Sequence, residues 1–177
     1  MTRGFAILFA FGAVVLTLLD SVHVHTHTLF YDQPFMYGSA WWVPLLMGSA
    51  ASFGGVIYAM GWKKFRGPEK LAPWPTIARA VFAAMLMYAA SGLLPASATS
   101  KLVVISIAAY VIWRDVDGTR AGAKLLVIGA IAGPIAEAIN PRFHYFDPDF
   151  CRVPIWLPAL YACITPALGQ LARRLLR

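Results

Sequence analysis

Long apolar stretches separated by short polar gaps most limit how this sequence can fold. The stretches cover residues 4–19, 40–60, 74–94, 101–113, 123–139 and 155–172. A helix of about 20 apolar residues spans the hydrocarbon core of a bilayer. The sequence therefore predicts an all-α membrane protein with six transmembrane helices, forming a single domain over residues 1–177.

Composition agrees with a membrane protein. Hydrophobic residues make up 59% of the chain and charged residues 13%, against about a quarter charged in soluble domains. The net charge of +7 raises the possibility of nucleic-acid binding. However, the basic residues lie in the gaps between apolar stretches, as membrane topology requires, so no nucleic-acid partner is predicted. Two cysteines exclude a disulfide framework.

The distribution of basic residues sets the orientation. With six crossings and a cytoplasmic N-terminus, twelve Lys and Arg residues lie inside and three, Lys101, Arg142 and Arg152, lie outside. Both termini are therefore predicted to be cytoplasmic. The first stretch also fits a signal peptide, but no small-residue cleavage site follows Leu19, which favours a helix. Residues 20–37 and 140–154 are predicted to be outer loops.

The second stretch combines an aromatic start with a small-residue face. Trp41 and Trp42 are typical of interfacial anchors. Gly48, Ser52 and Gly55 favour close helix packing, within one chain or between copies, so a homo-oligomer is expected. The Gly129-x-x-x-Gly133 motif in the fifth stretch has the same meaning.

Prolines are expected to leave a gap between some of the packed helices. Pro44, Pro134, Pro158 and Pro166 are predicted to interrupt the second, fifth and sixth helices. An interior proline kinks a helix and moves it away from its neighbour. We therefore expect a wedge-shaped opening toward lipid.

The side chains within the helices restrict what such an opening can bind. No Lys or Arg lies near mid-membrane depth, because Arg79, Lys101 and Lys124 are close to helix ends. A phosphate group there would lack a counter-charge, so a neutral lipid of the diacylglycerol or sterol type fits better. The hydroxyl groups available to bind its head belong to Ser49, Ser52, Thr76, Tyr88, Ser91, Ser106, Tyr110 and Thr165.

Three groups leave other functions open. Glu137 is a carboxylate inside a predicted helix, which a proton-coupled transporter could use, although its depth favours an interfacial position. His23, His25 and His27 would lie on one side of an extended chain and resemble a zinc site, but a solvated loop is the simpler interpretation, so no metal is predicted. Asp147, Asp149 and His144 suggest a lipid-modifying enzyme acting through the loop from Asn140 to Pro154, without any nucleophile motif.

Several motifs together resemble the Insig family, the insulin-induced-gene regulators of sterol synthesis. They are Ser39-Ala40-Trp41-Trp42-Val43-Pro44 with its small-residue run, Ala96-Ser97-Ala98, Trp113-x-x-x-Asp117-x-x-Arg120-x-Gly122, and Pro148-Asp149-Phe150 before Trp156-Leu157-Pro158. The matches keep their order along nearly the whole chain. The resemblance implies a six-helix protein without enzymatic activity or a cofactor, holding a lipid or sterol among its helices.

The resemblance also implies partners and a location. Eukaryotic members bind oxysterols and retain Scap and HMG-CoA reductase in the endoplasmic reticulum. Asp117 matches the acidic residue that these members need for Scap binding. Where animal members have a longer connection and a glutamine, this chain has Thr99, Ser100 and Lys101. It resembles a compact bacterial homologue, which is expected to lie in the cell membrane and to act as a lipid sensor or scaffold.

Two sets of site residues follow from the helix pattern and the resemblance. The loop set, expected to face a partner or to link helices, is Asp117, Gly118, Arg120 and Gly122. The set expected to line a lipid-binding cavity is Trp41, Trp42, Pro44, Gly48, Ser52, Gly55, Tyr88, Ser106, Tyr110, Trp156 and Pro158.

Overall fold

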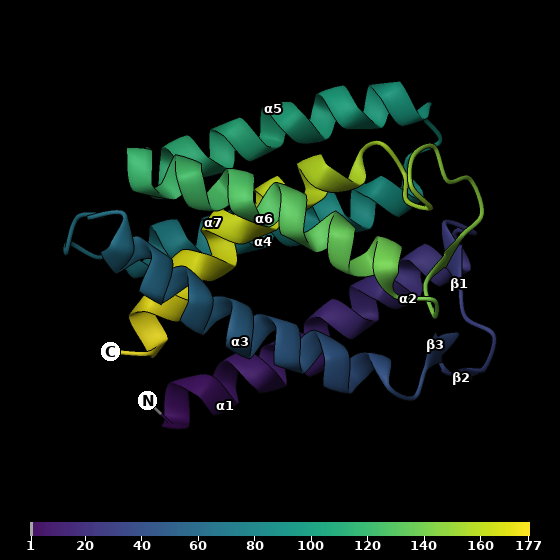
Figure 1. The fold of residues 1–177 in the computed structure, drawn as a ribbon, viewed down its shortest axis with the longest axis horizontal. Coiled ribbons are helices and arrows are strands. Elements are labelled where there is room, and N and C mark those ends of the chain that lie inside the picture. Colours follow the sequence, from purple (N-terminus) through teal and green to yellow (C-terminus); the bar gives the residue numbers. More distant parts are fainter. Residues whose placement is uncertain (1) are drawn as a thin grey trace.

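A computed structural model describes residues 2–177. Most of this chain is helical, and the connections between the helices contain a few short strands (Figure 1). The helices are α1 (Thr2–Phe11), the π-helical turn η1 (Gly12–Leu16), α2 (Thr17–His25), α3 (Val43–Lys64), α4 (Trp74–Leu93), α5 (Ala98–Val116), α6 (Arg120–Ile139) and α7 (Leu157–Leu175).

These helices form six rods, which confirms the predicted fold. α1, η1 and α2 join end to end into one rod, and the other five helices are a rod each. Four rods are long and apolar enough to cross a membrane: Arg3–His25, Val43–Lys64, Trp74–Leu93 and Arg120–Ile139. α5 and α7 have 19 residues each and run beside them (Figure 1). Both chain ends lie at the same end of the bundle, as six crossings require.

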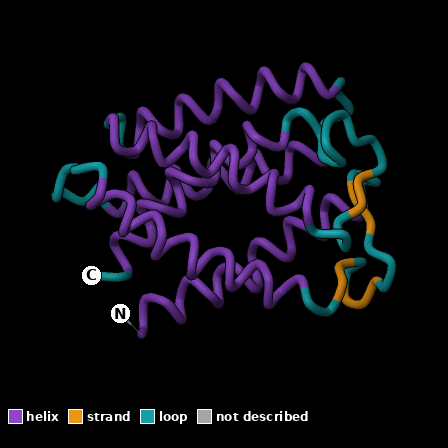
Figure 2. The backbone as a smooth tube through the Cα atoms, viewed as in Figure 1, coloured by secondary structure: helices purple, strands orange, loops and turns teal. Residues whose placement is uncertain are grey.

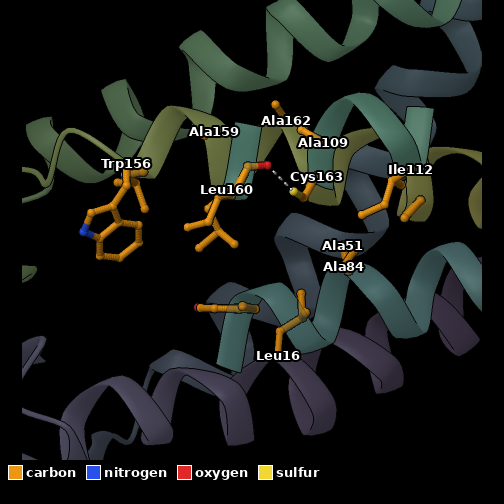
Figure 3. Packing of buried hydrophobic residues seen from close by; sticks show 14 of the residues in the cluster. Leu16, Ala51, Ala84, Ala109, Ile112, Trp156, Ala159, Leu160, Ala162 and Cys163 are labelled. Carbon is orange, nitrogen blue, oxygen red and sulfur yellow. Dashed lines mark hydrogen bonds between the residues drawn. The ribbon is translucent and has the colours of Figure 1, made fainter. Parts of the chain in front are cut away.

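The sixth rod is less apolar because it faces protein rather than lipid. α7 lies in the middle of the bundle and contacts α3, α4, α5 and α6. Its Leu160, Cys163 and Ala167 are at most 2% exposed. Figure 3 shows Cys163 among the alanines of neighbouring helices, with its Sγ donating to the backbone oxygen of Ile105 at 3.3 Å. Because α7 is surrounded by protein, its C-terminal third can contain the polar residues Gln170 and Arg173.

The outer connections are tied together by short strands (Figure 2). Two antiparallel pairs form, β1 with β4 and β2 with β3. The first pair joins the connection after α2 to the one after α6, pairing Leu29 with Tyr145. The strands are β1 (Leu29–Phe30), β2 (Pro34–Met36), β3 (Ser39–Ala40) and β4 (His144–Tyr145).

The first outer loop begins later than the sequence suggested. The prediction that residues 20–37 form a loop is wrong for its first part, because α2 continues to His25. Helix α2 carries the polar residues Asp20 and His23 because other protein groups satisfy them inside the bundle. The fourth rod is also longer than predicted and starts at Ala98, where Ser97 caps it by accepting from the backbone N–H of Ser100.

Two of the four prolines do not interrupt a helix. Pro44 and Pro158 lie in the first turns of α3 and α7, where a missing N–H costs nothing. That part of the prediction is wrong. Pro134 and Pro166 do lie inside α6 and α7, which continue past them.

Candidate functional site

A cavity of about 310 Å³ lies inside the bundle, between α3, α6 and α7. Helices α3 and α6 meet at the cytoplasmic end, where Tyr58, Trp62, Ala121 and Leu125 form a separate apolar cluster. Farther from that end both helices line the cavity instead, and α7 forms its back. An opening between these helices is therefore present. The apolar cluster closes it at the cytoplasmic end.

Small residues give the cavity its width. Gly54 and Gly55 of α3 and Gly129 and Gly133 of α6 are part of its lining. A side chain on Gly129 would overlap Thr165 of α7, so the small residues also let α6 and α7 approach closely. The remaining walls are largely apolar. None of the described lining residues is Lys or Arg.

Two carboxylates stand at the outer end of the cavity. Asp20 is 1% exposed. Its oxygens accept hydrogen bonds from the Tyr31 hydroxyl, at 3.0 Å, and from Ser39 Oγ, at 2.9 Å. Glu137 accepts from Tyr161 at 2.6 Å and from the Tyr145 hydroxyl through its other oxygen. Asp20 Oδ1 and both oxygens of Glu137 have one donor each and retain a lone pair for a further donor.

The tyrosines act as fixed donors. Burial raises the pKa of Tyr31 and of Tyr145 above the ordinary value for a phenol. Both hydroxyls therefore keep their protons and hold the carboxylates in place. Trp42 packs edge-on against Tyr31, with ring centroids 5.4 Å apart, and supports it from outside the cavity.

His23 and Tyr88 complete the polar end. His23 Nε2 is 2.8 Å from Ser91 Oγ and 3.2 Å from the backbone oxygen of Tyr88. The Tyr88 side chain lies against the His23 ring, with centroids 4.9 Å apart, and lines the cavity. No described residue accepts a hydrogen bond from the Tyr88 hydroxyl. The outer end of the cavity thus offers carboxylate acceptors and the Tyr88 phenol as a donor.

This arrangement suits a ligand with a neutral, hydroxyl-bearing head and apolar tails. Carboxylates accept hydrogen bonds from hydroxyl groups, and charged acceptors make the stronger bonds. The same carboxylates repel a phosphate group, for which the described lining has no cation. The apolar walls formed by α3, α6 and α7 would face the tails.

The predicted cavity residues are dispersed in the structure. Gly55 and Tyr88 line the cavity. Gly48 and Ser52 face α1, where Gly48 packs against Phe9 and the Ser52 hydroxyl donates to the backbone oxygens of Gly48 and Phe5. Close packing is therefore what these two residues provide.

Apart from Tyr88, the aromatic residues of the predicted set lie outside the cavity. Trp41 is 59% exposed at the outer end, as an interfacial anchor would be, and Trp42 and Pro44 lie beside it. Ser106 and Tyr110 lie on the exposed face of α5. Trp156 is buried against His23, with ring centroids 5.9 Å apart, and Pro158 follows in the first turn of α7.

The cytoplasmic loop residues are turned inward more than expected. Asp117 accepts from the backbone N–H of Thr119, and Gln170 of α7 donates to its other oxygen at 3.5 Å. Gly118 has a φ of +61° and Gly122 packs directly against the Asp117 carboxylate. Arg120 is exposed. This geometry fits a helix-linking turn.

The histidines do not gather around a metal. His23 is buried in the helix, whereas His25 and His27 are exposed, and His25 Nδ1 bonds the backbone oxygen of Ser21. Across residues 2–177 no group of three or more His, Cys, Asp or Glu side chains is placed to hold a metal ion.

Sequence reasoning missed the main polar group of the site. Asp20 and His23 were assigned to a loop, and Tyr161 and Tyr145 were not considered. Glu137 is noted in the sequence, but its place in the cavity lining is not predicted. A usable signal was present: Asp20 and His23 are three residues apart, which places both on one face of a helix that continues the first apolar stretch.

The fold and the cavity define a class. This is an integral membrane protein of six helical rods that enclose an apolar cavity with carboxylates at its outer end.

Comparisons with known proteins place the chain within this class. It is similar to the insulin-induced gene 1 proteins of Cricetulus griseus, with 27% identity covering 96% of this chain and 69% of that protein, and of Danio rerio, with 27% identity covering 99% and 73%. The similarity to Insig proteins extends over nearly the whole chain, in agreement with its motifs. No family model matches it.

Solved structures support the same fold. A crystal structure of the Insig homologue MvINS from Mycobacterium vanbaalenii superposes with a TM-score of 0.84 at 23% identity, covering 96% of this chain and 92% of that one. A cross-linked MvINS trimer gives a TM-score of 0.85, covering 98% and 94%.

Proposed function

We propose that this protein binds a neutral, hydroxyl-bearing lipid in the cavity, and that it acts as a lipid sensor or scaffold without enzymatic activity. One observation carries the proposal: the apolar cavity ends in Asp20, Glu137 and the free Tyr88 hydroxyl, with no basic residue in its described lining. A diacylglycerol or a sterol has the matching head. At about 310 Å³ the cavity is within the range of ligand pockets, and longer tails would continue into the bilayer.

Lipid extraction tests this proposal directly. The protein is purified in a mild detergent and its retained lipids are identified by mass spectrometry. We expect neutral lipids with a free hydroxyl to be enriched over their membrane abundance. A Gly54→Leu variant, which adds a side chain to the cavity lining where no atom lies within 4 Å of the new Cβ, should lose them, whereas Ala78→Leu on the exposed face of α4 should retain them. Phospholipid alone, at bulk membrane ratios, would refute the proposal.

A second function has one observation in its favour. Glu137 is a half-buried carboxylate within a membrane helix and lines the cavity, as a small proton-coupled transporter or a lipid-modifying enzyme would need. A Glu137→Gln variant separates the alternatives. Transport or turnover would collapse without the carboxylate, whereas lipid retention should persist at reduced affinity, because the amide oxygen still accepts a hydrogen bond.

We infer that copies of the chain associate. The homologue MvINS was crystallised as a cross-linked trimer. The apolar outer faces of α4 and α5, including Phe82, Leu86 and Ile107, are exposed and available to lipid or to another copy. Native mass spectrometry in detergent should show a trimer, and a monomer at all protein concentrations would contradict this inference.

The eukaryotic partners are a conditional part of the proposal. Binding of Scap or HMG-CoA reductase is proposed only for a cell that contains these proteins. On this chain the cytoplasmic loop with Asp117 and Arg120 is the candidate surface. Because Asp117 is half-buried and bonded to its own turn, the Asp117→Asn variant should be compared with Arg120→Ala, which removes only an exposed group.

A further inference from the structure

A second pocket, of about 730 Å³, opens at the outer end of the bundle near the turn between α4 and α5. The rings of His23 and Trp156, with centroids 5.9 Å apart, stand between it and the cavity described above. His23 lines the cavity and Trp156 lines the second pocket. The two spaces therefore have a common wall and different lining residues.

Hydrogen-bond donors converge on one side of this pocket. The first residues of the 19-residue helix α5 line it, including the cap residue Ser97 and Ala98. Ser97 satisfies the backbone N–H groups of Ser100 and Lys101, but no described residue accepts from the N–H groups of Ala98 or Thr99. The start of a helix with free N–H groups attracts anions.

Two side chains add to this donor side. Trp156 is 4% exposed, and no described residue accepts a hydrogen bond from its indole N–H. Lys101 is half-buried, with its Nζ 5.9 Å from the centre of the Trp156 ring. No described carboxylate lies within 4.0 Å of that ammonium group. A buried N–H donor and an unpaired ammonium thus face the same space as the helix start.

Two acidic residues also line the pocket. Asp147 and Asp149 line it from the connection before α7, and both are exposed. One oxygen of Asp149 accepts from the backbone N–H of Ile155 at 2.9 Å, whereas no described residue bonds the Asp147 carboxylate. The positive and negative groups of the pocket are therefore separated rather than paired with each other.

We propose that this pocket binds a zwitterionic headgroup of the phosphoethanolamine type. The phosphate lies against the start of α5, Lys101 and the Trp156 indole, and the ammonium group lies toward Asp147 and Asp149. An anion without an ammonium group meets two uncompensated carboxylates, and a cation without a phosphate leaves Lys101 unpaired. Because the pocket lies at the outer end of the helices, an outer-leaflet phospholipid is the expected source.

Native mass spectrometry of the detergent-purified protein tests this proposal, with phosphatidylethanolamine and phosphatidylglycerol added in equal amounts. The wild type should retain phosphatidylethanolamine in preference to phosphatidylglycerol. Lys101→Met should weaken retention about tenfold, and Lys101→Arg should preserve it. Asp147→Asn should shift the preference toward phosphatidylglycerol. Lys64→Met, an exposed lysine at the opposite end of the bundle, is the matched control and should behave as the wild type.

Three results would overturn the proposal. Equal retention of both phospholipids by the wild type would show that the acidic side plays no part. Undiminished retention by a folded Lys101→Met variant would show that the donor side plays none. Stabilisation of the wild type by soluble phosphoethanolamine, without any retained phosphatidylethanolamine, would identify a free metabolite and refute the lipid source. Diacylglycerol retention should be unchanged in the Lys101 and Asp147 variants, which separates this site from the cavity.

Discussion

At the scale of single residues, the protein places charged groups where a membrane makes them costly and compensates each one locally. Asp20 is enclosed by donors from Tyr31 and Ser39. Arg173 is 7% exposed and stacks on Trp62 at 3.8 Å, while its guanidinium donates to Gln170 and to the backbone oxygen of Pro68. A buried polar group without such partners would cost about 1–3 kcal/mol.

Removing one of these donors should measurably weaken the fold. Tyr31→Phe deletes the hydroxyl that bonds both oxygens of Asp20 and leaves the buried carboxylate with Ser39. We expect a loss of about 1–3 kcal/mol in the free energy of unfolding, measured by denaturation in detergent micelles. Tyr37→Phe is the control, since Tyr37 is 64% exposed. Equal effects of the two substitutions would contradict the assigned role of Tyr31.

Asp117 should make stability depend on pH. Burial raises the pKa of its carboxyl above the ordinary 3.8, despite hydrogen bonds from Thr119 and Gln170 that lower it. The folded state therefore binds this proton more tightly than the unfolded state, so the contribution of Asp117 to stability falls as the pH rises from below 3.8 through the raised folded pKa. Thermal unfolding of the wild type and Asp117→Asn should diverge over this range, with the variant relatively more stable at neutral pH. Parallel curves would refute this coupling.

At the scale of elements, helix contacts follow patterns of small residues that can be recognised in the sequence, whereas the choice of partner cannot. The Gly129-x-x-x-Gly133 motif does mark a close contact, and its partner is α7. The small residues of α3 divide their roles: Gly48 and Ser52 pack on α1, whereas Gly54 and Gly55 line the cavity. A repeat of small residues defines a face of a helix, but which neighbour occupies that face depends on the whole bundle.

A matched pair of glycine substitutions tests this contact. A Cβ on Gly133 would overlap the Tyr161 ring, so Gly133→Ala should destabilise the protein by about 1–3 kcal/mol. It should also weaken lipid retention, because Tyr161 holds Glu137. Nothing lies within 4 Å of a Cβ on Gly54, so Gly54→Ala should leave stability unchanged or raise it by up to about 1 kcal/mol. Both are measured by unfolding in detergent. A neutral Gly133→Ala would disprove the close approach of α6 and α7.

At the scale of the whole molecule, the charge distribution and the bundle agree on one topology. The basic loop after α3 and the chain ends lie at one end of the bundle, and the paired strands lie at the other (Figure 1). The strand pair β1–β4 connects loops that are far apart in the sequence and closes the outer end beside the cavity. Residues from Asp20 to Tyr161 thereby meet at one site.

The two cysteines report this topology. Cys151 is exposed in the outer connection, and Cys163 is fully buried in α7. A membrane-impermeant maleimide added to intact cells should label the wild type once, and Cys151→Ala should abolish the labelling. Labelling that appears only after the membrane is broken would place this connection inside and reverse the proposed orientation.

The sequence by itself indicated the helical class and the six helical rods, predicted the orientation, and placed no Lys or Arg at mid-membrane depth, because hydropathy and loop charge act on each segment independently. It also supported the family through its ordered motifs. Only the tertiary structure decided where the cavity lies, because a cavity is a property of several helices packed together. Trp41 and Trp42 lie outside the cavity, at the outer end of the bundle. The polar end of the cavity is formed by Asp20, Tyr88 and Glu137, which are distant in sequence and meet only in the folded bundle.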